Sequence, residues 1–369
     1  MTVHDTIIIG GGLHGCSTAL HLARKGLKPV LIEKDYAGRH ASGVNAGGVR
    51  QLMRDIAEIP LSIRSMELWE NIGDLVEDDC AFDSHGQVLV AETQADLQTC
   101  IDRVAKLNAK GFTHEELISA EEIRALLPAV AESCTGGIIS RRDGAAQPAR
   151  TTSAFRRRAE QLGATIIEGA SAGNVRKKTG LWHVDVGGET FTAPNLIIAA
   201  GAWGGGFAEQ FGEAVPMKAV APMLMITSRV PHFIDPVVIL RSRKLSFKQF
   251  ANGTVLIGGG HLGVADPASN TTLLNWGKLR ESVRTVFDLF EIMRQATIVR
   301  AWAGIEGKMA DDLPVFGPST RHQGLFYQFG FSLHGFQLGP AAGAVMAELV
   351  TEGRTPTDIS GLSMSRFHH

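Results

Sequence analysis

The sequence predicts an α/β protein that carries a second, strand-rich block. Its N-terminus contains a short apolar run, a glycine-rich turn, a helical pattern and a second apolar run, which is the order of a parallel βαβ unit. Apolar runs of strand length then dominate residues 215–302, whereas helical and strand patterns alternate before them. At 369 residues, the chain is expected to form two or three domains.

The composition is that of a globular protein with balanced charge. Hydrophobic residues make up 44% and charged residues 20%, so a sizeable core is expected. A formal net charge of −2 favours neither nucleic acid nor an anionic membrane as a partner. No apolar run has the length of a transmembrane helix, and the first residues do not resemble a signal peptide. A cytoplasmic protein is therefore expected.

Neither cysteines nor histidines are spaced as metal ligands. The four cysteines are scattered and form no CxxC pair, so we expect thiols in a reducing compartment. The thirteen histidines show no ligand spacing. No metal site is predicted.

The N-terminal unit carries the pattern of a dinucleotide-binding turn. Residues 10–15 read Gly-Gly-Gly-Leu-His-Gly and satisfy GxGxxG between two strand-like runs. Gly10 permits the tight turn, Gly12 lets backbone approach a pyrophosphate, and Gly15 lets helix and strand pack closely. Glu33 ends the second run, where a carboxylate can accept from ribose hydroxyls.

A segment of small residues follows this unit, at positions 35–50. Such a segment can lie along the rest of a long cofactor, where larger side chains would clash. Together with the position of the turn at the start of the chain, it favours FAD over NAD. An ordinary glycine-rich turn is the alternative.

The other elements are predicted from periodicity and turn residues. Helices are expected over 16–23, where Gly26 ends the pattern, and at 56–69, 95–107, 120–126, 148–162, 273–290 and 341–349. Strands are expected at 6–9, 29–32, 87–90, 164–168, 182–186, 196–199, 237–240, 245–250, 254–257 and 296–302.

Two further glycine clusters are expected to approach the cofactor. Gly201–Gly206 follows a buried strand, although it could be an ordinary turn. Gly330–Gly339 precedes a predicted helix, whose free N–H groups would face the flavin edge that gathers negative charge. The alternative is a helix cap with Pro340 in the first turn. His334 would either add charge at that edge or pack as a polar residue.

Several motifs resemble the D-amino-acid oxidase, glycine oxidase and sarcosine oxidase superfamily of flavoproteins over essentially the whole chain. They are the Asn45-Ala46-Gly47-Gly48 loop, the Ile197–Trp203 segment and the C-terminal glycine cluster. Trp302–Gly307, Asp312–Pro318 and Gly330–Pro340 resemble one subgroup. It contains the FAD subunits of bacterial opine (octopine or nopaline) oxidases and D-hydroxyproline dehydrogenases, which are related to sarcosine oxidase β subunits.

The resemblance implies a glycine-oxidase-like layout. A Rossmann-type FAD-binding domain would be assembled from residues 1–80, 137–214 and 303–369. A mixed-sheet substrate or interaction domain, from 81–136 and 215–302, would be interleaved with it.

The chain departs from its resembled families at four places. Glu306 stands near the position of the arginine that grips the substrate carboxylate in glycine oxidases. No cysteine lies beyond Cys134, so the covalent flavin of monomeric sarcosine oxidase is impossible, and noncovalent FAD is expected. Gln337 replaces a lysine of that enzyme, and Leu256 or a neighbour replaces its oxygen-activating lysine. These changes argue against a simple monomeric oxidase.

The predicted site has a cofactor part and a substrate part. FAD is expected to contact Gly10, Gly12, Leu13, His14, Gly15, Glu33, Lys34, Ser42, Asn45, Ala46, Gly47, Gly48, Val175, Ala200, Gly201, Trp203, Gly304, Gly335, Phe336 and Gln337. Arg50, His334 and Gln337 are the candidate catalytic residues. Arg50 could bind a carboxylate through both guanidinium nitrogens, although a structural ion pair is the alternative and Arg54 is a competitor.

The expected function is FAD-dependent oxidation of the C–N bond of an amino acid or N-substituted amino acid, by hydride transfer to flavin N5. An opine, a hydroxyproline or sarcosine would be the substrate. By resemblance, the chain would be the catalytic subunit of a hetero-oligomer whose second subunit carries FMN, FAD or an iron–sulfur cluster. The alternatives are a scaffold subunit with structural FAD and an α-hydroxy-acid dehydrogenase.

Overall fold

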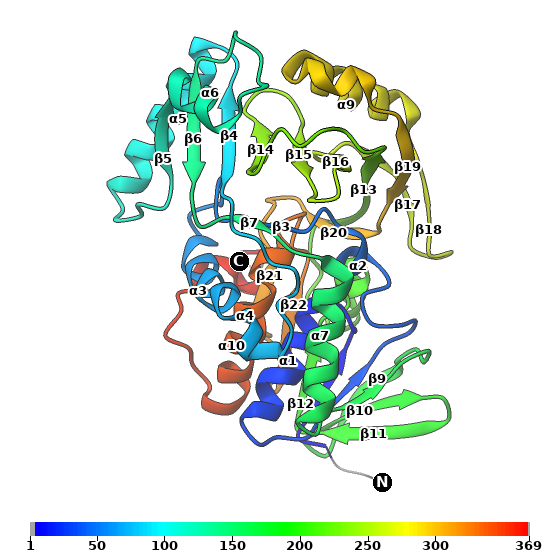
Figure 1. The fold of residues 1–369 in the computed structure, drawn as a ribbon. Helices are drawn as coiled ribbons and strands as arrows, with labels where there is room; N and C mark the ends of the chain where they lie inside the picture. The colour runs from blue at the N-terminus through cyan, green and yellow to red at the C-terminus, as the bar shows by residue number, and fades with distance from the viewer. Residues whose placement is uncertain (1–3, 368–369) are drawn as a thin grey trace.

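The computed structural model describes residues 4–367, which are arranged around two large sheets (Figure 1). The helices are α1 (Leu13–Arg24), α2 (Ala41–Val44), α3 (Ile59–Glu70), α4 (Ile72–Val76), α5 (Gln94–Asn108), α6 (Ala120–Leu126), α7 (Pro148–Gln161), α8 (Gly204–Gln210), α9 (Trp276–Leu289) and α10 (Gly335–Glu352). Most of the predicted helices are present, with shifted ends.

The first sheet holds the N-terminal unit at its centre. Its order is β21 (Val315–Pro318), β22 (Leu325–Phe329), β12 (Asn195–Ile198), β1 (Thr6–Ile9), β2 (Pro29–Ile32) and β8 (Thr165–Ile167). All neighbours are parallel except β21, which runs antiparallel to β22. Strands flank β1 on both sides and it is buried on both faces, which explains its unbroken apolar sequence.

Helices pack on one face of this sheet, and a second, smaller sheet packs on the other. Ile8 belongs to the core beneath α1, α7 and α10. Ile7 and Ile9 point the other way, because side chains alternate along a strand. They pack on a three-stranded sheet of β11 (Glu189–Ala193), β10 (Leu181–Val186) and β9 (Gly173–Lys178).

The second sheet contains eleven strands. Nine strands lie in the order β18 (Thr271–Leu273), β17 (Leu262–Asp266), β13 (Met217–Thr227), β16 (Val255–Gly258), β15 (Ser246–Gln249), β14 (Val237–Leu240), β4 (Gln87–Ala91), β6 (Gly136–Ser140) and β5 (Glu116–Ser119). The other two, β19 (Ile298–Ala303) and β20 (Glu306–Met309), also pair with β13. One face packs on α9, where the Phe247 and Phe290 rings stack at 4.9 Å between centroids. The opposite face of β4 and β6 packs on α5.

The strand pairing moves two of the expected domain boundaries. β6 lies within the expected FAD-binding segment 137–214, yet it pairs with β4 and β5 of the second sheet. β20 lies within the expected segment 303–369, yet it pairs with β13. We retain a two-domain division as a proposal, with both strands assigned to the substrate domain.

The last helix begins earlier than the sequence predicts. Pro340 does not open α10 but lies inside it, after a start at Gly335. The helix backbone next to Pro340 is bonded to α3: Gln337 O accepts from Ser65 Oγ and Trp69 Nε1, and Ala341 N donates to Ser65 Oγ at 3.3 Å. The cap with Pro340 in the first turn is therefore wrong.

Two strand regions also differ from the expectation. The predicted helix 273–290 begins only at Trp276, because Thr271–Leu273 pairs with β17 as an edge strand. β9 and β11 were not predicted, because each buries few apolar side chains: in β9 only Val175 is buried, and in β11 only Thr192 and Ala193 are.

Candidate active site

One large cavity of about 770 Å³ extends from the glycine turn to the second sheet. Its walls include β1, α2, the start of α10 and the loop that joins β14 to β15. Most of the predicted cofactor residues line it: Gly10, Gly12, Leu13, His14, Glu33, Lys34, Ser42, Asn45, Ala46, Gly48, Ala200, Gly201, Trp203, Gly304, Gly335 and Phe336.

The glycine turn forms a close backbone cradle at one end of the cavity. Leu13 N donates to Ser42 Oγ at 2.9 Å, and a Cβ on Gly12 would lie 2.9 Å from the same oxygen. A Cβ on Gly15 would lie 1.9 Å from Gly10 O, so glycine is required for this packing. The positions therefore suit a phosphate group that must approach the backbone.

The acidic residue at the end of β2 faces this cradle. Glu33 Oε2 accepts from Gly11 N at 2.6 Å, and Glu33 Oε1 accepts from Asp35 N at 2.9 Å. The side chain is nearly buried and lines the cavity, so it is held in place before any ribose arrives.

Two aromatic contacts complete the cofactor end. The ring of His14 stacks on Phe331 with 3.7 Å between centroids, and burial lowers the pKa of His14 to about 4, so it is neutral at pH 7. Lys34 Nζ lies 3.4 Å from the ring centroid of Trp203 and donates to Asn270 Oδ1 at 2.6 Å. The β17–β18 turn thus reaches across to the first sheet.

The loop after α2 is shaped by one asparagine. Asn45 Nδ2 donates to Ala41 O at 2.9 Å, and Asn45 Oδ1 accepts from Gly47 N at 2.7 Å. Gly47 has a φ of 70°, and a Cβ there would lie 2.1 Å from Ala146 O. Gly47 therefore shapes the loop without lining the cavity.

Four predicted positions lie outside the cavity lining: Gly15, Gly47, Val175 and Gln337. Val175 is buried in the core under the three-stranded sheet, and the cavity is lined by Ser171 and Ala172 instead. The cofactor contacts predicted for Gly15, Gly47 and Val175 are therefore corrected to supporting positions.

Gln337 is fully buried between α3 and α10. Its Nε2 donates to Ser62 O at 2.9 Å, and its Oε1 accepts from Ser62 Oγ at 3.0 Å and from Arg54 Nη2 at 3.2 Å. Because these polar atoms are engaged inside the protein, both the catalytic and the cofactor role predicted for Gln337 are corrected. It holds helices together.

The two arginines have different surroundings. Arg50 is half-buried and lines the cavity, and its Nη1 donates to Leu52 O. Arg54 also lines the cavity but is buried, and it donates from Nε to Arg50 O at 2.9 Å and from Nη2 to His334 O at 3.0 Å. Arg54 therefore ties together the backbones of two candidate residues.

His334 lies at the start of α10 beside a buried carboxylate that sequence reasoning missed. Its Nδ1 is 3.3 Å from Glu58 Oε2, while Arg54 Nη1 is 3.9 Å from the same oxygen. Burial lowers the pKa of His334, against the effect of Glu58. Burial acts to raise the pKa of Glu58, but the adjacent His334 ring and the charge of Arg54 hold it below its usual value.

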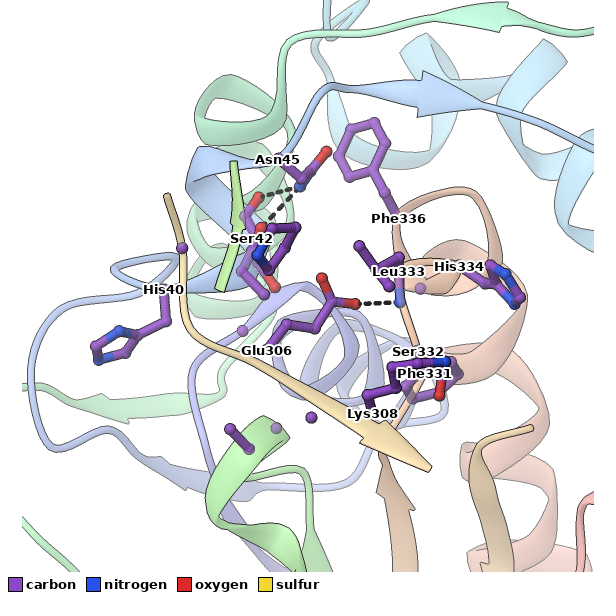
Figure 2. A pocket seen from close by; sticks show the side chains of 18 of the residues that line it. His40, Ser42, Asn45, Glu306, Lys308, Phe331, Ser332, Leu333, His334 and Phe336 are labelled. Atoms are coloured by element: carbon purple, nitrogen blue, oxygen red, sulfur yellow. Dashed lines mark hydrogen bonds between the residues drawn. The ribbon is translucent and has the colours of Figure 1, made fainter. Parts of the chain in front are cut away.

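Glu306 is a second unpredicted functional candidate, because the sequence showed it only as a departure. Figure 2 shows its carboxylate among Ser42, Asn45 and Leu333, inside the cavity. Its Oε1 accepts from Leu333 N at 2.6 Å. The motif after Trp302 was the available signal, although it gave no role for an acidic residue.

Residues 4–367 lack two features that would change the kind of site. None of their helices is long and apolar enough to cross a membrane. They contain no group of three or more His, Cys, Asp or Glu residues suited to hold a metal ion. All four cysteines are buried free thiols.

The βαβ cradle, the buried acid after β2 and a cavity that continues into a second sheet define a dinucleotide-dependent oxidoreductase. The chain belongs to the DAO family of FAD dependent oxidoreductases, whose model matches residues 5–349. Family membership confirms FAD as the cofactor, and the cradle and Glu33 fit such a group.

Individual relatives are similar over nearly their whole length. The sarcosine oxidase subunit beta of Rhodobacter capsulatus is 23% identical over 361 residues, which cover 96% of this chain and 86% of the relative. The glycine oxidase of Geobacillus kaustophilus is 23% identical over 371 residues, which cover 98% and 97%. The predicted superfamily is thereby confirmed.

Solved structures agree on the fold. L-proline dehydrogenase from P. horikoshii matches with a TM-score of 0.91 at 24% identity, covering 99% of this chain and 98% of that one. The glycine oxidase from Geobacillus kaustophilus matches with a TM-score of 0.90 at 22% identity, covering 99% of both chains. The predicted glycine-oxidase-like fold is confirmed.

Proposed function

We propose that this protein oxidises the C–N bond of an amino acid or N-substituted amino acid, such as an opine, a hydroxyproline or sarcosine. The observation that carries the proposal is a single cavity lined both by the dinucleotide cradle and by Arg50 and His334. FAD, when bound, supplies the acceptor for a hydride at its N5 atom. The names of sarcosine oxidase, glycine oxidase and L-proline dehydrogenase support this substrate class.

The chain's own residues would orient the substrate. Arg50 has a side chain in the cavity and a guanidinium geometry that matches a carboxylate, so we assign it the substrate carboxylate. His334, neutral because of burial, would hold its Nδ1–H toward Glu58 and leave Nε2 for the cavity.

The decisive experiment is an anaerobic panel on the purified holoprotein, with flavin bleaching as the measurement. Glycine, sarcosine, L-proline, hydroxyproline, octopine, nopaline and D-amino acids should include at least one compound that bleaches the flavin. Bleaching by lactate or glycerol alone would favour an α-hydroxy-acid dehydrogenase. No bleaching at full FAD content would favour a scaffold subunit.

We also propose noncovalent FAD and a hetero-oligomeric assembly. The absence of cysteine beyond Cys134 supports the first, and acid precipitation should leave the flavin in the supernatant. The likeness to sarcosine oxidase beta subunits supports a second subunit, and we propose that it carries its own FMN, FAD or iron–sulfur cluster. Free buried thiols support a cytoplasmic location.

A further inference from the structure

Glu306 has one carboxylate oxygen committed to the fold and one that is not. Oε1 accepts from Leu333 N, within a turn in which Ser332 and Leu333 have φ angles of 50° and 70°. The carboxylate stabilises this costly turn. No donor within hydrogen-bond distance of Oε2 occurs among residues 4–367, and the carboxylate projects into the cavity (Figure 2).

The charged groups around Glu306 do not neutralise it. Lys308, two residues along β20, pairs with Asp312. Lys218 stands on β13, opposite Lys308 in the ladder. His334 lies at the start of α10, and the neighbouring 3-10 helix, Gly201–Trp203, carries no charge. Glu306 therefore has no dedicated cationic partner in the described chain.

Burial raises the pKa of Glu306 to about 7, against the opposing effects of the Leu333 N–H and the charge of Lys308. Both protonation states are therefore populated near neutral pH, as a group that accepts and releases protons requires.

We propose that Glu306 accepts the proton of the substrate ammonium group, so that the substrate class is an amine that enters the cavity protonated. The inference rests on the proposed C–N oxidation, which needs the nitrogen lone pair free. One N–H bond breaks, its electron pair stays on nitrogen, and the proton bonds to Glu306 Oε2. No electron is transferred in this step, and the carboxylic acid returns the proton to water before the next turnover.

The matched variant is Glu306→Gln, whose amide oxygen can still accept from Leu333 N while the side chain cannot take up a proton. Glu121→Gln, an exposed change on α6, is the control. The measurement is the limiting rate of flavin reduction between pH 5.5 and 10, with sarcosine, L-proline and glycine as probes.

The wild-type limiting rate should rise through an ionisation near pH 7 and then level off. The variant should be at least tenfold slower at pH 7 and regain rate toward the ionisation of the free amine, at about 10. An unchanged limiting rate in the variant overturns the proposal. So does a variant in which only the half-saturating substrate concentration changes, because Glu306 would then merely anchor a cation.

A second measurement needs no turnover. In holoprotein with carbon-13-labelled glutamate carboxyls, the signal missing from Glu306→Gln should titrate near pH 7. Titration at the ordinary glutamate value, about 4.3, overturns the inference. Failure of every amine to bleach the wild-type flavin instead contradicts the proposed function, and the titration still decides the state of Glu306.

Discussion

Lys248 on β15 stands directly opposite Leu256 on β16 in the antiparallel ladder. The resemblance placed Leu256, or a neighbour, where an oxygen-activating lysine would lie. The sheet therefore brings a lysine next to that position from another strand. Lys248 is buried and does not line the cavity, however, so its ammonium group is not presented to the cofactor.

Leu256 stands where the resemblance places an oxygen-activating lysine, and the neighbouring Lys248 does not line the cavity, so we expect slow reaction of the reduced flavin with oxygen. A cation close to the flavin would stabilise the negative charge of forming superoxide. The chain should be photoreduced and mixed either with air-saturated buffer or with phenazine methosulfate. Reoxidation should be slower with oxygen, and Lys248→Met should not change that rate by more than about twofold. Reoxidation by oxygen at the same rate as by the dye would identify an ordinary oxidase.

Lys248→Met should stabilise the protein at neutral pH. Burial lowers the pKa of Lys248 to about 8, compared with about 10.4 in an unfolded chain, which corresponds to about 3 kcal/mol below pH 8. The unfolded lysine binds more protons between these values, so wild-type stability rises with pH across that window. The urea midpoint of the variant should exceed that of the wild type at pH 7, and the difference should be smaller at pH 10. An equal advantage at both pH values would mean that the pKa of Lys248 is the same in the folded and unfolded states.

Glu33→Ala should weaken FAD binding by about 1–3 kcal/mol, because it removes an acceptor that is fixed at the cradle. Equilibrium titration of the apoprotein with FAD measures the effect. Glu352→Gln, which alters an exposed pair with Lys25, is the control and should bind FAD as the wild type does. Equal affinities for Glu33→Ala and the control would assign Glu33 to the fold alone.

Arg50→Lys should raise the half-saturating substrate concentration for flavin reduction more than tenfold and leave the FAD content intact. Lysine keeps the charge but loses the paired N–H geometry. Arg54→Lys should instead lower stability, because Arg54 bonds the backbones of Arg50 and His334. If Arg50→Lys leaves substrate binding unchanged, Arg54 becomes the residue assigned to the substrate carboxylate.

Gly343→Ala should destabilise the fold by about 1–3 kcal/mol, the usual cost of overpacking. A Cβ there would lie 2.2 Å from Ser17 Oγ, across the contact between α10 and α1. Gly73→Ala is the matched control, because a Cβ on this exposed helical glycine would meet nothing within 4 Å. The control should be neutral or slightly stabilising in thermal unfolding. Similar midpoints for both variants would show that α1 shifts freely.

The N-terminal unit could be predicted because its signals are local. Strand, turn, helix and acid follow one another within a few dozen residues, and each has its own sequence pattern. The start of α10 could not be predicted in this way. Pro340 normally marks a helix start, whereas here it lies inside a helix whose neighbouring backbone bonds to Ser65 and Trp69, far away in sequence.

The substrate end of the site was less predictable for the same reason. Glu58 faces His334 only because α3 packs on α10. The glutamine in the C-terminal motif, Gln337, points into that same packing and not into the cavity. A sequence motif gives the residue type at a position, whereas the direction of its side chain depends on a partner helix.

The packing of α10 on α1 has a consequence for synthesis. The ribosome makes α1 long before α10, so the glycines that cover Leu13 and Ser17 follow them by more than 300 residues. One wall of the cavity, residues 328–336, arrives just before them. We therefore expect the complete FAD cavity to form only after α10 has been translated, and the apolar side of α1 to be exposed until then.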